Sequence, residues 1–281
     1  MQFGMNLLLW ATHVTAEHFP ILEKLKKTGY DGVELPVFEG DVAHFKNIGA
    51  ELKKQGLRST AVTVVTPEAN PISPDAALRK AGLERIKWAI DMTAAAGGES
   101  LCGPFHSPLA VFSGDPPTGD EKKRCAEVMR QAAEYAKTAK VQLCIEYLNR
   151  FECYFLTTAA DAVALVKAVD HPSFKTMYDT FHANIEEKSQ ASAIATATGH
   201  FAHVHISEND RGTPGTGQVH WDEAFKALKQ TGYDGWFVIE AFGRALPALA
   251  AATKVWRDLF PNPEEVYTQG LRFMKQNLGK A

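Results

Sequence analysis

The chain has 281 residues, 45% of them hydrophobic and 22% charged, which is enough apolar sequence for one large buried core or two smaller ones. This composition argues against a disordered chain, a collagen-like repeat and a small disulfide-stapled scaffold. The 30 Lys and Arg against 33 Asp and Glu give a net charge of −3 without a long basic run, which argues against nucleic acid as a partner.

Targeting signals and cysteines give a consistent expectation about the compartment. The N-terminal segment MQFGMNLLLW is apolar but lacks the preceding basic residues of a secretory signal, and no apolar segment approaches the roughly 20 residues of a membrane span. The cysteines Cys102, Cys125, Cys144 and Cys153 lack CxxC spacing and are expected to be reduced. The sequence therefore predicts a cytoplasmic protein with no membrane partner.

Eight short apolar runs recur along the chain, and each is typical of a β-strand. In chain order they cover residues 3–9, 32–37, 59–65, 100–103, 141–148, 174–180, 201–207 and 236–242. The segments between them carry apolar residues at three- and four-residue intervals, as amphipathic helices do. These predicted helices cover residues 18–28, 42–55, 75–96, 120–140, 158–169, 221–231 and 263–277.

The alternation of strands and helices predicts an α/β fold, a (β/α)8 TIM barrel. Several strands are apolar almost throughout, as in a parallel sheet that is buried on both faces. Eight units in 281 residues are about 35 residues each, the usual size for this barrel. A doubly wound open sheet is the structural alternative, but the glycine-rich phosphate turn after its first strand is missing. No linker divides the chain, so residues 1–281 are expected to form one domain, with 112–120 as a surface loop.

Each of the last four predicted strands carries one charged or metal-ligating residue near its carboxyl end. These residues are Glu146, Asp179, His205 and Glu240, each between apolar neighbours. In a barrel of this type the active site lies at the carboxyl ends of the strands. A single such residue is as readily explained by a buried ion pair, but three carboxylates without basic partners at the strand ends favour a bound cation. Three oxygen ligands and one imidazole favour Mn²⁺, Mg²⁺ or Co²⁺, with Zn²⁺ left open.

Four stretches of the second half resemble the ketose 3-epimerases, the D-tagatose and D-psicose (D-allulose) 3-epimerase group of the xylose isomerase-like barrels. They are IEYLNRFE (145–152), DTFHANIEE (179–187), HVHISENDRGTPGTGQVHWDEAF (203–225) and GYDGWFVIEAF (232–242). The resemblance implies that Glu146, Asp179, His205 and Glu240 bind one divalent metal ion, with Mn²⁺ first. It also implies that Glu146 and Glu240 are the catalytic acid/base pair.

The same resemblance implies that Glu152, His182 and Arg211 hold the oxygens at the C1 to C3 end of a sugar. The first half of the chain is similar only in layout, so Trp10, Val65, Phe105, His106 and Phe242 are candidates for pocket lining by position alone. Members of the group are commonly dimers or tetramers, which predicts a homodimer or homotetramer.

Epimerisation of a ketose at C3 needs two bases on opposite faces of one carbon, and an enediolate is formed between the two proton transfers. A divalent ion supplies Lewis-acid stabilisation of that enediolate.

The sequence leaves alternative functions open. An aldose–ketose isomerase would use the same metal site. An abasic-site endonuclease would need a basic groove for DNA, and the net charge of −3 argues against one. A non-catalytic sugar-binding barrel would lack some of the metal-ligating residues, and all four are present here. A phosphorylated sugar stays open because GTPGTG (212–217) follows the seventh strand, although the resemblance favours a free ketose.

Overall fold

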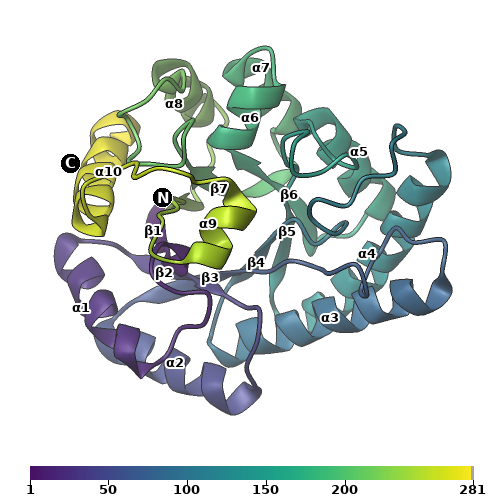
Figure 1. The fold of residues 1–281 in the computed structure, drawn as a ribbon, viewed down its shortest axis with the longest axis horizontal. Helices are drawn as coiled ribbons and strands as arrows, with labels where there is room; N and C mark the ends of the chain where they lie inside the picture. The colour runs from purple at the N-terminus through teal and green to yellow at the C-terminus, as the bar shows by residue number, and fades with distance from the viewer. Residues whose placement is uncertain (280–281) are drawn as a thin grey trace.

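A closed ring of eight parallel strands confirms the predicted (β/α)8 barrel in the computed structural model, which describes residues 1–279. Neighbouring strands in the chain pair with each other, and β1 closes the ring by pairing with β8. The strands form the inner ring and the helices form the outer layer (Figure 1). The strands are β1 (Gln2–Asn6), β2 (Gly32–Pro36), β3 (Arg58–Val62), β4 (Ser100–Gly103), β5 (Gln142–Ile145), β6 (Phe174–Asp179), β7 (Phe201–Ile206) and β8 (Trp236–Ile239).

Most of the described helices pack around this ring, and most of the helices begin at a side-chain cap. Asp41, Asp75, Thr118 and Thr158 each accept a hydrogen bond from a backbone amide in the first turn of the helix that follows. The helices are α1 (Phe19–Thr28), α2 (Val42–Gln55), α3 (Ala76–Ala95), α4 (Gly119–Ala139), α5 (Ala159–Val169), α6 (Thr180–Glu186), α7 (Gln190–Ala197), α8 (Trp221–Gln230), α9 (Pro247–Thr253) and α10 (Pro263–Leu278), with 3₁₀ turns at Leu7–Leu9 and Ala16–His18.

Several predicted strands end earlier than their apolar runs suggest. The first strand stops at Asn6, whose side chain accepts a hydrogen bond from the amide of Leu8 and starts a 3₁₀ turn. Apolar sequence continues past β5 and β8 because Leu148 and Phe242 line a cavity at the mouth of the barrel. The apolar residues beyond these two strands are therefore buried in the cavity wall, although they no longer belong to a β-strand.

Three short helices were not predicted from the sequence: α6, α7 and α9. They have seven or eight residues each, too few to display a clear helical period. In Figure 1, α9 is seen over the centre of the ring, and its residues Leu249, Ala252 and Thr253 line the cavity at the mouth of the barrel. The sequence pattern therefore missed a helix that covers the site.

No helix able to cross a lipid bilayer occurs between residues 1 and 279, since none combines the required length with enough apolar character. The cysteines Cys102, Cys125, Cys144 and Cys153 are all buried and free.

Gly103, the last residue of β4, is at a position that tolerates no side chain. Its φ is +118°, and a Cβ there would overlap the carbonyl oxygen of Thr63. The carbonyl of Gly103 also accepts the backbone hydrogen bond of Glu146 at 3.0 Å. We expect Gly103→Ala to lower the free energy of unfolding by about 3 kcal/mol, measured by urea unfolding with circular dichroism.

Gly97 provides the matched control for this substitution. Its φ is +74°, but nothing lies within 4 Å of the position that a Cβ would occupy. Gly97→Ala therefore carries only the cost of the left-handed backbone, about 1 kcal/mol. Equal losses in the two variants would show that the overlap with Thr63 is relieved without cost.

Candidate active site

Glu146, Asp179, His205 and Glu240 converge at the carboxyl end of the barrel. Asp179 at the end of β6 is the register partner of His205 in β7, so their side chains start at the same level. Glu146 and Glu240 directly follow β5 and β8, and each extends its ladder by one backbone hydrogen bond, to Gly103 and to Ile206. All four side chains are buried, with at most 5% of the residue exposed.

Asp179, His205 and Glu240 lie close enough together to hold one ion. His205 Nδ1 lies 3.3 Å from Asp179 Oδ2, 3.5 Å from Glu240 Oε1 and 3.9 Å from Glu146 Oε1. Atoms bound about 2.1 Å from a common ion are about 3.0 Å apart at right angles and about 3.4 Å apart at tetrahedral angles. The first two separations fit such an arrangement. Glu146 lies farther from His205 and is grouped instead with Asp179 and His182.

Two buried polar atoms of the group have no hydrogen-bond partner within the described chain, and both face its centre. They are His205 Nδ1 and Asp179 Oδ2. Asp179 Oδ1, by contrast, accepts from the amides of Phe181 at 2.6 Å and His182 at 3.1 Å, because it caps α6. Buried polar atoms are nearly always paired, and a cation bound between these two atoms would pair both of them.

The electrostatics of the carboxylates lead to the same requirement. Burial, reinforced by the charge of Asp179, raises the pKa of Glu240 to about 7. Burial, together with the charges of Glu240 and Asp179, raises the pKa of Glu146 well above its usual range. Carboxylates held this close repel one another in a medium of low dielectric. A divalent cation between them would remove that repulsion, so the donor set fits a metal ion.

The three residues expected to contact a sugar lie beside these four. Arg211 donates two hydrogen bonds to Glu152, at 2.8 and 3.1 Å, and its guanidinium stacks 4.0 Å from the ring centre of Phe181. Arg211 has a φ of +65°, a left-handed conformation that is uncommon outside glycine. The Arg211–Glu152 pair therefore presents a fixed planar charge at the edge of the cavity.

His182 is held in one orientation by the chain that follows β5. Its Nδ1 accepts a hydrogen bond from the amide of Asn149 at 2.9 Å, so its Nε2 carries the hydrogen. That Nε2 points towards Glu146 Oε1, at 3.5 Å. Burial lowers the pKa of His182 to about 4, so the ring is neutral near pH 7. His182 is thus a neutral hydrogen-bond donor at the cavity.

A cavity of about 100 Å³ joins these groups, and its walls are otherwise mostly apolar. Its lining residues are Leu8, Phe38, Val62, Val64, Pro104, Leu109, Glu146, Leu148, Glu152, His182, Arg211, Glu240, Phe242, Leu249, Ala252 and Thr253. Phe242 is the one candidate for pocket lining that belongs to this wall. Trp10 lines a separate surface cavity beside Tyr267, and Val65, Phe105 and His106 are buried but do not line the site cavity.

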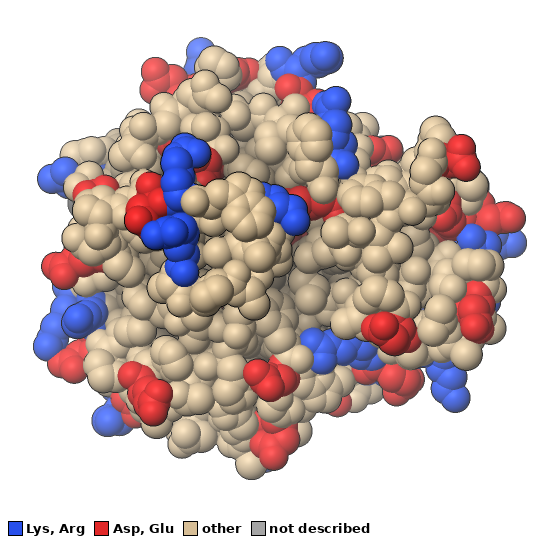
Figure 2. Space-filling model, viewed as in Figure 1, with Lys and Arg blue, Asp and Glu red and all other residues tan. Residues whose placement is uncertain are grey.

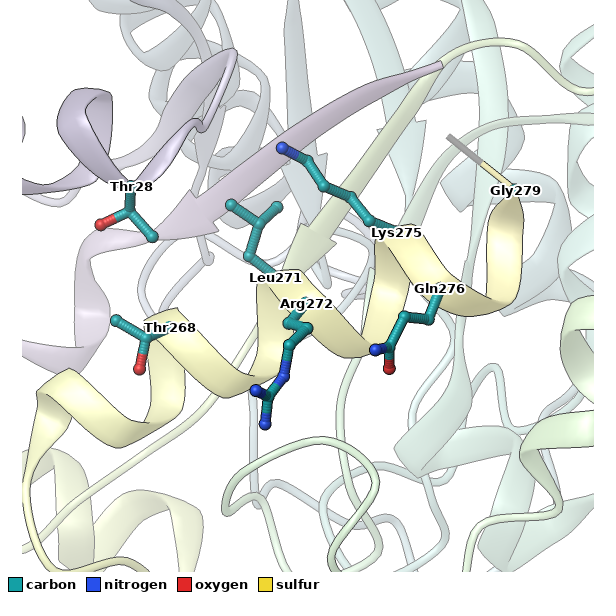
Figure 3. Close-up of a pocket in the computed structure, with 7 residues that line it drawn as sticks. All are labelled: Thr28, Thr268, Leu271, Arg272, Lys275, Gln276 and Gly279. Carbon is teal, nitrogen blue, oxygen red and sulfur yellow. The ribbon is translucent and has the colours of Figure 1, made fainter. Parts of the chain in front are cut away.

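A larger hollow of about 490 Å³ lies away from this group, between α1 and α10 (Figure 3). It is lined by Thr28, Thr268, Leu271, Arg272, Lys275, Gln276 and Gly279. Thr28 is the last residue of α1 and Gly279 follows the last residue of α10. In a β/α barrel the carboxyl ends of the helices lie beside the amino ends of the strands, opposite the active site. This hollow offers neither a carboxylate nor a histidine, so the cavity at the strand ends is the candidate active site.

Sequence reasoning did not single out Glu34, which is buried in β2 and contacts His205 Nε2 at 2.7 Å. The signal was present, because Glu34 is a carboxylate in the apolar run GVELP. The other four residues were recognised because each lies at the carboxyl end of one of the last four strands. Glu34 does not meet this criterion, because it lies in the middle of its strand and in the first half of the chain.

Known proteins resemble this chain over nearly its whole length. The family described as the xylose isomerase-like TIM barrel matches residues 22–277. A probable ketose 3-epimerase from Synechocystis sp. is 30% identical over 98% of this chain and 96% of the relative. A D-psicose 3-epimerase from Agrobacterium fabrum is 34% identical over 92% and 91%. The crystal structure of a D-allulose 3-epimerase from Methylomonas sp. in complex with D-allulose has a TM-score of 0.92 at 29% identity, covering 99% of this chain and 97% of that chain.

Proposed function

The chain belongs to the ketose 3-epimerase family of xylose isomerase-like TIM barrels and is an isomerase, and from this we propose that it epimerises free ketoses at C3 with one divalent metal ion. The proposed substrate is a ketose of the D-tagatose, D-psicose, D-fructose or L-ribulose type. The observation that carries the proposal is the pair of unpartnered acceptors, His205 Nδ1 and Asp179 Oδ2, buried between two further carboxylates.

Glu146, Asp179, His205 and Glu240 are the residues that would hold the ion. Three carboxylate oxygens and one imidazole suit Mn²⁺, which we propose as the first choice, with Co²⁺ and Mg²⁺ as alternatives. When bound, such an ion supplies Lewis-acid stabilisation of the negative charge that develops on the sugar oxygens.

Glu146 and Glu240 are the proposed acid/base pair. They follow β5 and β8, with β6 and β7 between them in the ring, and both line the cavity. One carboxylate removes the proton from C3, next to the carbonyl at C2, and the other carboxyl group returns a proton to the opposite face of C3. Burial raises the pKa of both groups, which supports this role because a carboxyl group with a raised pKa is a stronger base and, once protonated, a usable proton donor.

His182, Arg211 and Glu152 are proposed to orient the sugar at its C1 to C3 end. The Nε2–H of His182 is available as a donor because the amide of Asn149 occupies Nδ1. Arg211 provides a positive charge and Glu152 holds that charge in place. Donors fixed before the substrate binds stabilise developing charge without having to reorganise.

Two observations favour a free ketose over a phosphorylated one. In the loop after β7, the amides of Gly212 and Gly215 already donate to Asp210 and Glu208, at 2.9 and 2.8 Å. Arg244 is paired with Asp258 at 2.8 Å on the exposed surface, so it is not free to bind a phosphate.

The distribution of surface charge bears on the endonuclease alternative. The positive and negative side chains on the face seen in Figure 2 are interspersed, which does not favour the basic groove of an abasic-site endonuclease.

Removal of the metal tests the proposal directly. The enzyme treated with a chelator is expected to lose at least about 99% of its turnover of a ketohexose, since the carboxylates then repel one another and Lewis-acid stabilisation is lost. Mn²⁺ added after removal of the chelator is expected to restore turnover. Chromatography of the products identifies the reaction: a C3 epimer supports the proposal, and an aldose would identify an aldose–ketose isomerase instead.

The homodimer or homotetramer indicated by the family resemblance stays a prediction. Sedimentation velocity of the purified protein at micromolar concentration measures the assembly state directly.

A further inference from the structure

Glu34 is a fully buried carboxylate in the middle of β2. Its register partners are Asn6 in β1 and Thr60 in β3, and it reaches across the interior of the barrel to β7. There it contacts Nε2 of His205, while the carboxylates of the candidate metal site surround Nδ1 of the same ring. Glu34 thus lies on the far side of the imidazole from the proposed metal ion.

Hydrogen-bond donors converge on this one carboxylate from several strands. Asn6 Nδ2 donates to Oε1 at 2.9 Å, and Thr60 Oγ1 and Cys102 Sγ donate to Oε2 at 2.9 and 3.1 Å. His203 Nε2 lies 2.8 Å from Oε2, and none of these partners is a lysine or an arginine. An ionised carboxylate accepts hydrogen bonds only, so this surrounding network matches an anion.

The contact with His205 decides which of its ring nitrogens is free. His205 Nε2 and Glu34 Oε1 are 2.7 Å apart, a hydrogen bond in which the carboxylate accepts. The hydrogen of a neutral His205 ring is then on Nε2, and the lone pair is on Nδ1, which has no hydrogen-bond partner among residues 1–279. That lone pair is directed towards Asp179 and Glu240.

A second metal site is the competing interpretation of Glu34, Cys102, His203 and His205, which lie close enough together to hold an ion. The contacts of Glu34 with the two histidines, 2.7 and 2.8 Å, are shorter than the roughly 3.0–3.4 Å expected between ligands of one ion. The contact with His205 is a hydrogen bond of charge-assisted length, whereas His203 Nε2 has no hydrogen-bond partner among residues 1–279. The cluster is therefore a hydrogen-bonded support for the metal site.

We propose that Glu34 is a positioning residue, which holds His205 as the Nε2–H tautomer and so directs Nδ1 to the divalent ion; this inference rests on the proposed metal-dependent function. A carboxylate that accepts from the remote N–H of a ligating histidine fixes the ring and makes the ligating nitrogen more basic. Glu34 is not among the residues that line the substrate cavity, and its hydrogen bond to the candidate metal site goes to His205. Its effect on activity is exerted through His205.

Calorimetric titration of the metal-free full-length protein with Mn²⁺ tests this role. Glu34→Gln is expected to weaken Mn²⁺ binding about 10- to 100-fold, because the amide is a weaker acceptor and cannot hold the ring in the same way. Thr60→Val is the matched control: it removes a donor to Oε2 and leaves the contact of Oε1 with His205 in place. The control is expected to bind Mn²⁺ within about three-fold of the wild type.

Any other result would contradict the inference that Glu34 positions His205. Equal Mn²⁺ affinity of the wild type and Glu34→Gln would remove the role of Glu34 while the metal-dependent function stands. An equal loss in Thr60→Val would show a general packing effect. Two Mn²⁺ ions per chain would make Glu34 a ligand, and a wild type that binds no Mn²⁺ would overturn the proposed function as well.

A measurement on the wild type keeps the test valid if Glu34→Gln does not fold. Long-range ¹H–¹⁵N spectra of the Mg²⁺-loaded protein report which histidine ring nitrogens carry hydrogen. The inference requires the hydrogen of His205 to be on Nε2. A hydrogen on Nδ1 would contradict it.

Discussion

Replacing Glu240 with glutamine is expected to reduce turnover of a ketose by about 10³- to 10⁴-fold, and Glu146→Gln is expected to do the same. An amide cannot accept the proton from C3, so each variant lacks one of the two proposed bases. Both residues line the cavity and lie within 3.9 Å of His205 Nδ1. Turnover is measured by chromatography at saturating Mn²⁺, with the bound metal quantified in each variant.

Deuterium exchange separates loss of a base from loss of the site. In D₂O, a variant with one remaining base is expected to exchange the C3 hydrogen of only one of the two epimers, and the two variants are expected to exchange opposite epimers. Glu84→Gln, on the exposed surface of α3, is the matched control and is expected to keep full turnover. Turnover within ten-fold of the wild type in Glu146→Gln or Glu240→Gln would rule out the two-base scheme.

Arg211→Lys is expected to lower kcat/KM by about 10²- to 10³-fold although it keeps the positive charge. An ammonium group cannot reproduce the two parallel hydrogen bonds to Glu152 or the stacking on Phe181. Glu152 then stays buried without its planar partner, and the sugar loses a fixed contact. Steady-state kinetics with separate kcat and KM values measure the effect, and thermal unfolding checks that the barrel remains intact.

Arg150→Lys is the matched control for this substitution. Arg150 pairs with Glu186 at 3.0 Å but is largely exposed, with 61% of its side chain accessible to solvent. Surface ion pairs contribute little, so kcat/KM is expected to stay within about two-fold of the wild type. A loss of less than about three-fold in Arg211→Lys would show that charge alone is sufficient at this position.

The closed ring was predictable because each strand carries its own local signal. The apolar runs, the helical periods between them and the glycines that end α1 and α2 in left-handed conformations are all local properties of the chain. Glu146, Asp179, His205 and Glu240 were singled out in the same way, since each interrupts an apolar run. Parallel strands in one barrel present their carboxyl ends on one face, and the structure brings these four side chains together there.

Other parts of the site depend on contacts between distant segments. Trp10 follows β1 closely but lines a different cavity, and the site is covered instead by α9, from far along the chain. Asp179 caps α6 with one oxygen, and only the folded chain shows that the other oxygen is free. His106 was a candidate by position, yet it is buried against Phe155.

By itself the sequence determined the barrel and the identity of the four converging side chains, because strand periodicity and a charged residue in an apolar run are local patterns. Only the tertiary structure decided which ring nitrogen of His205 faces the carboxylates, which walls enclose the cavity and how Glu34 reaches β7. These features depend on distances between residues far apart in the chain, and such distances exist only after the ring has closed.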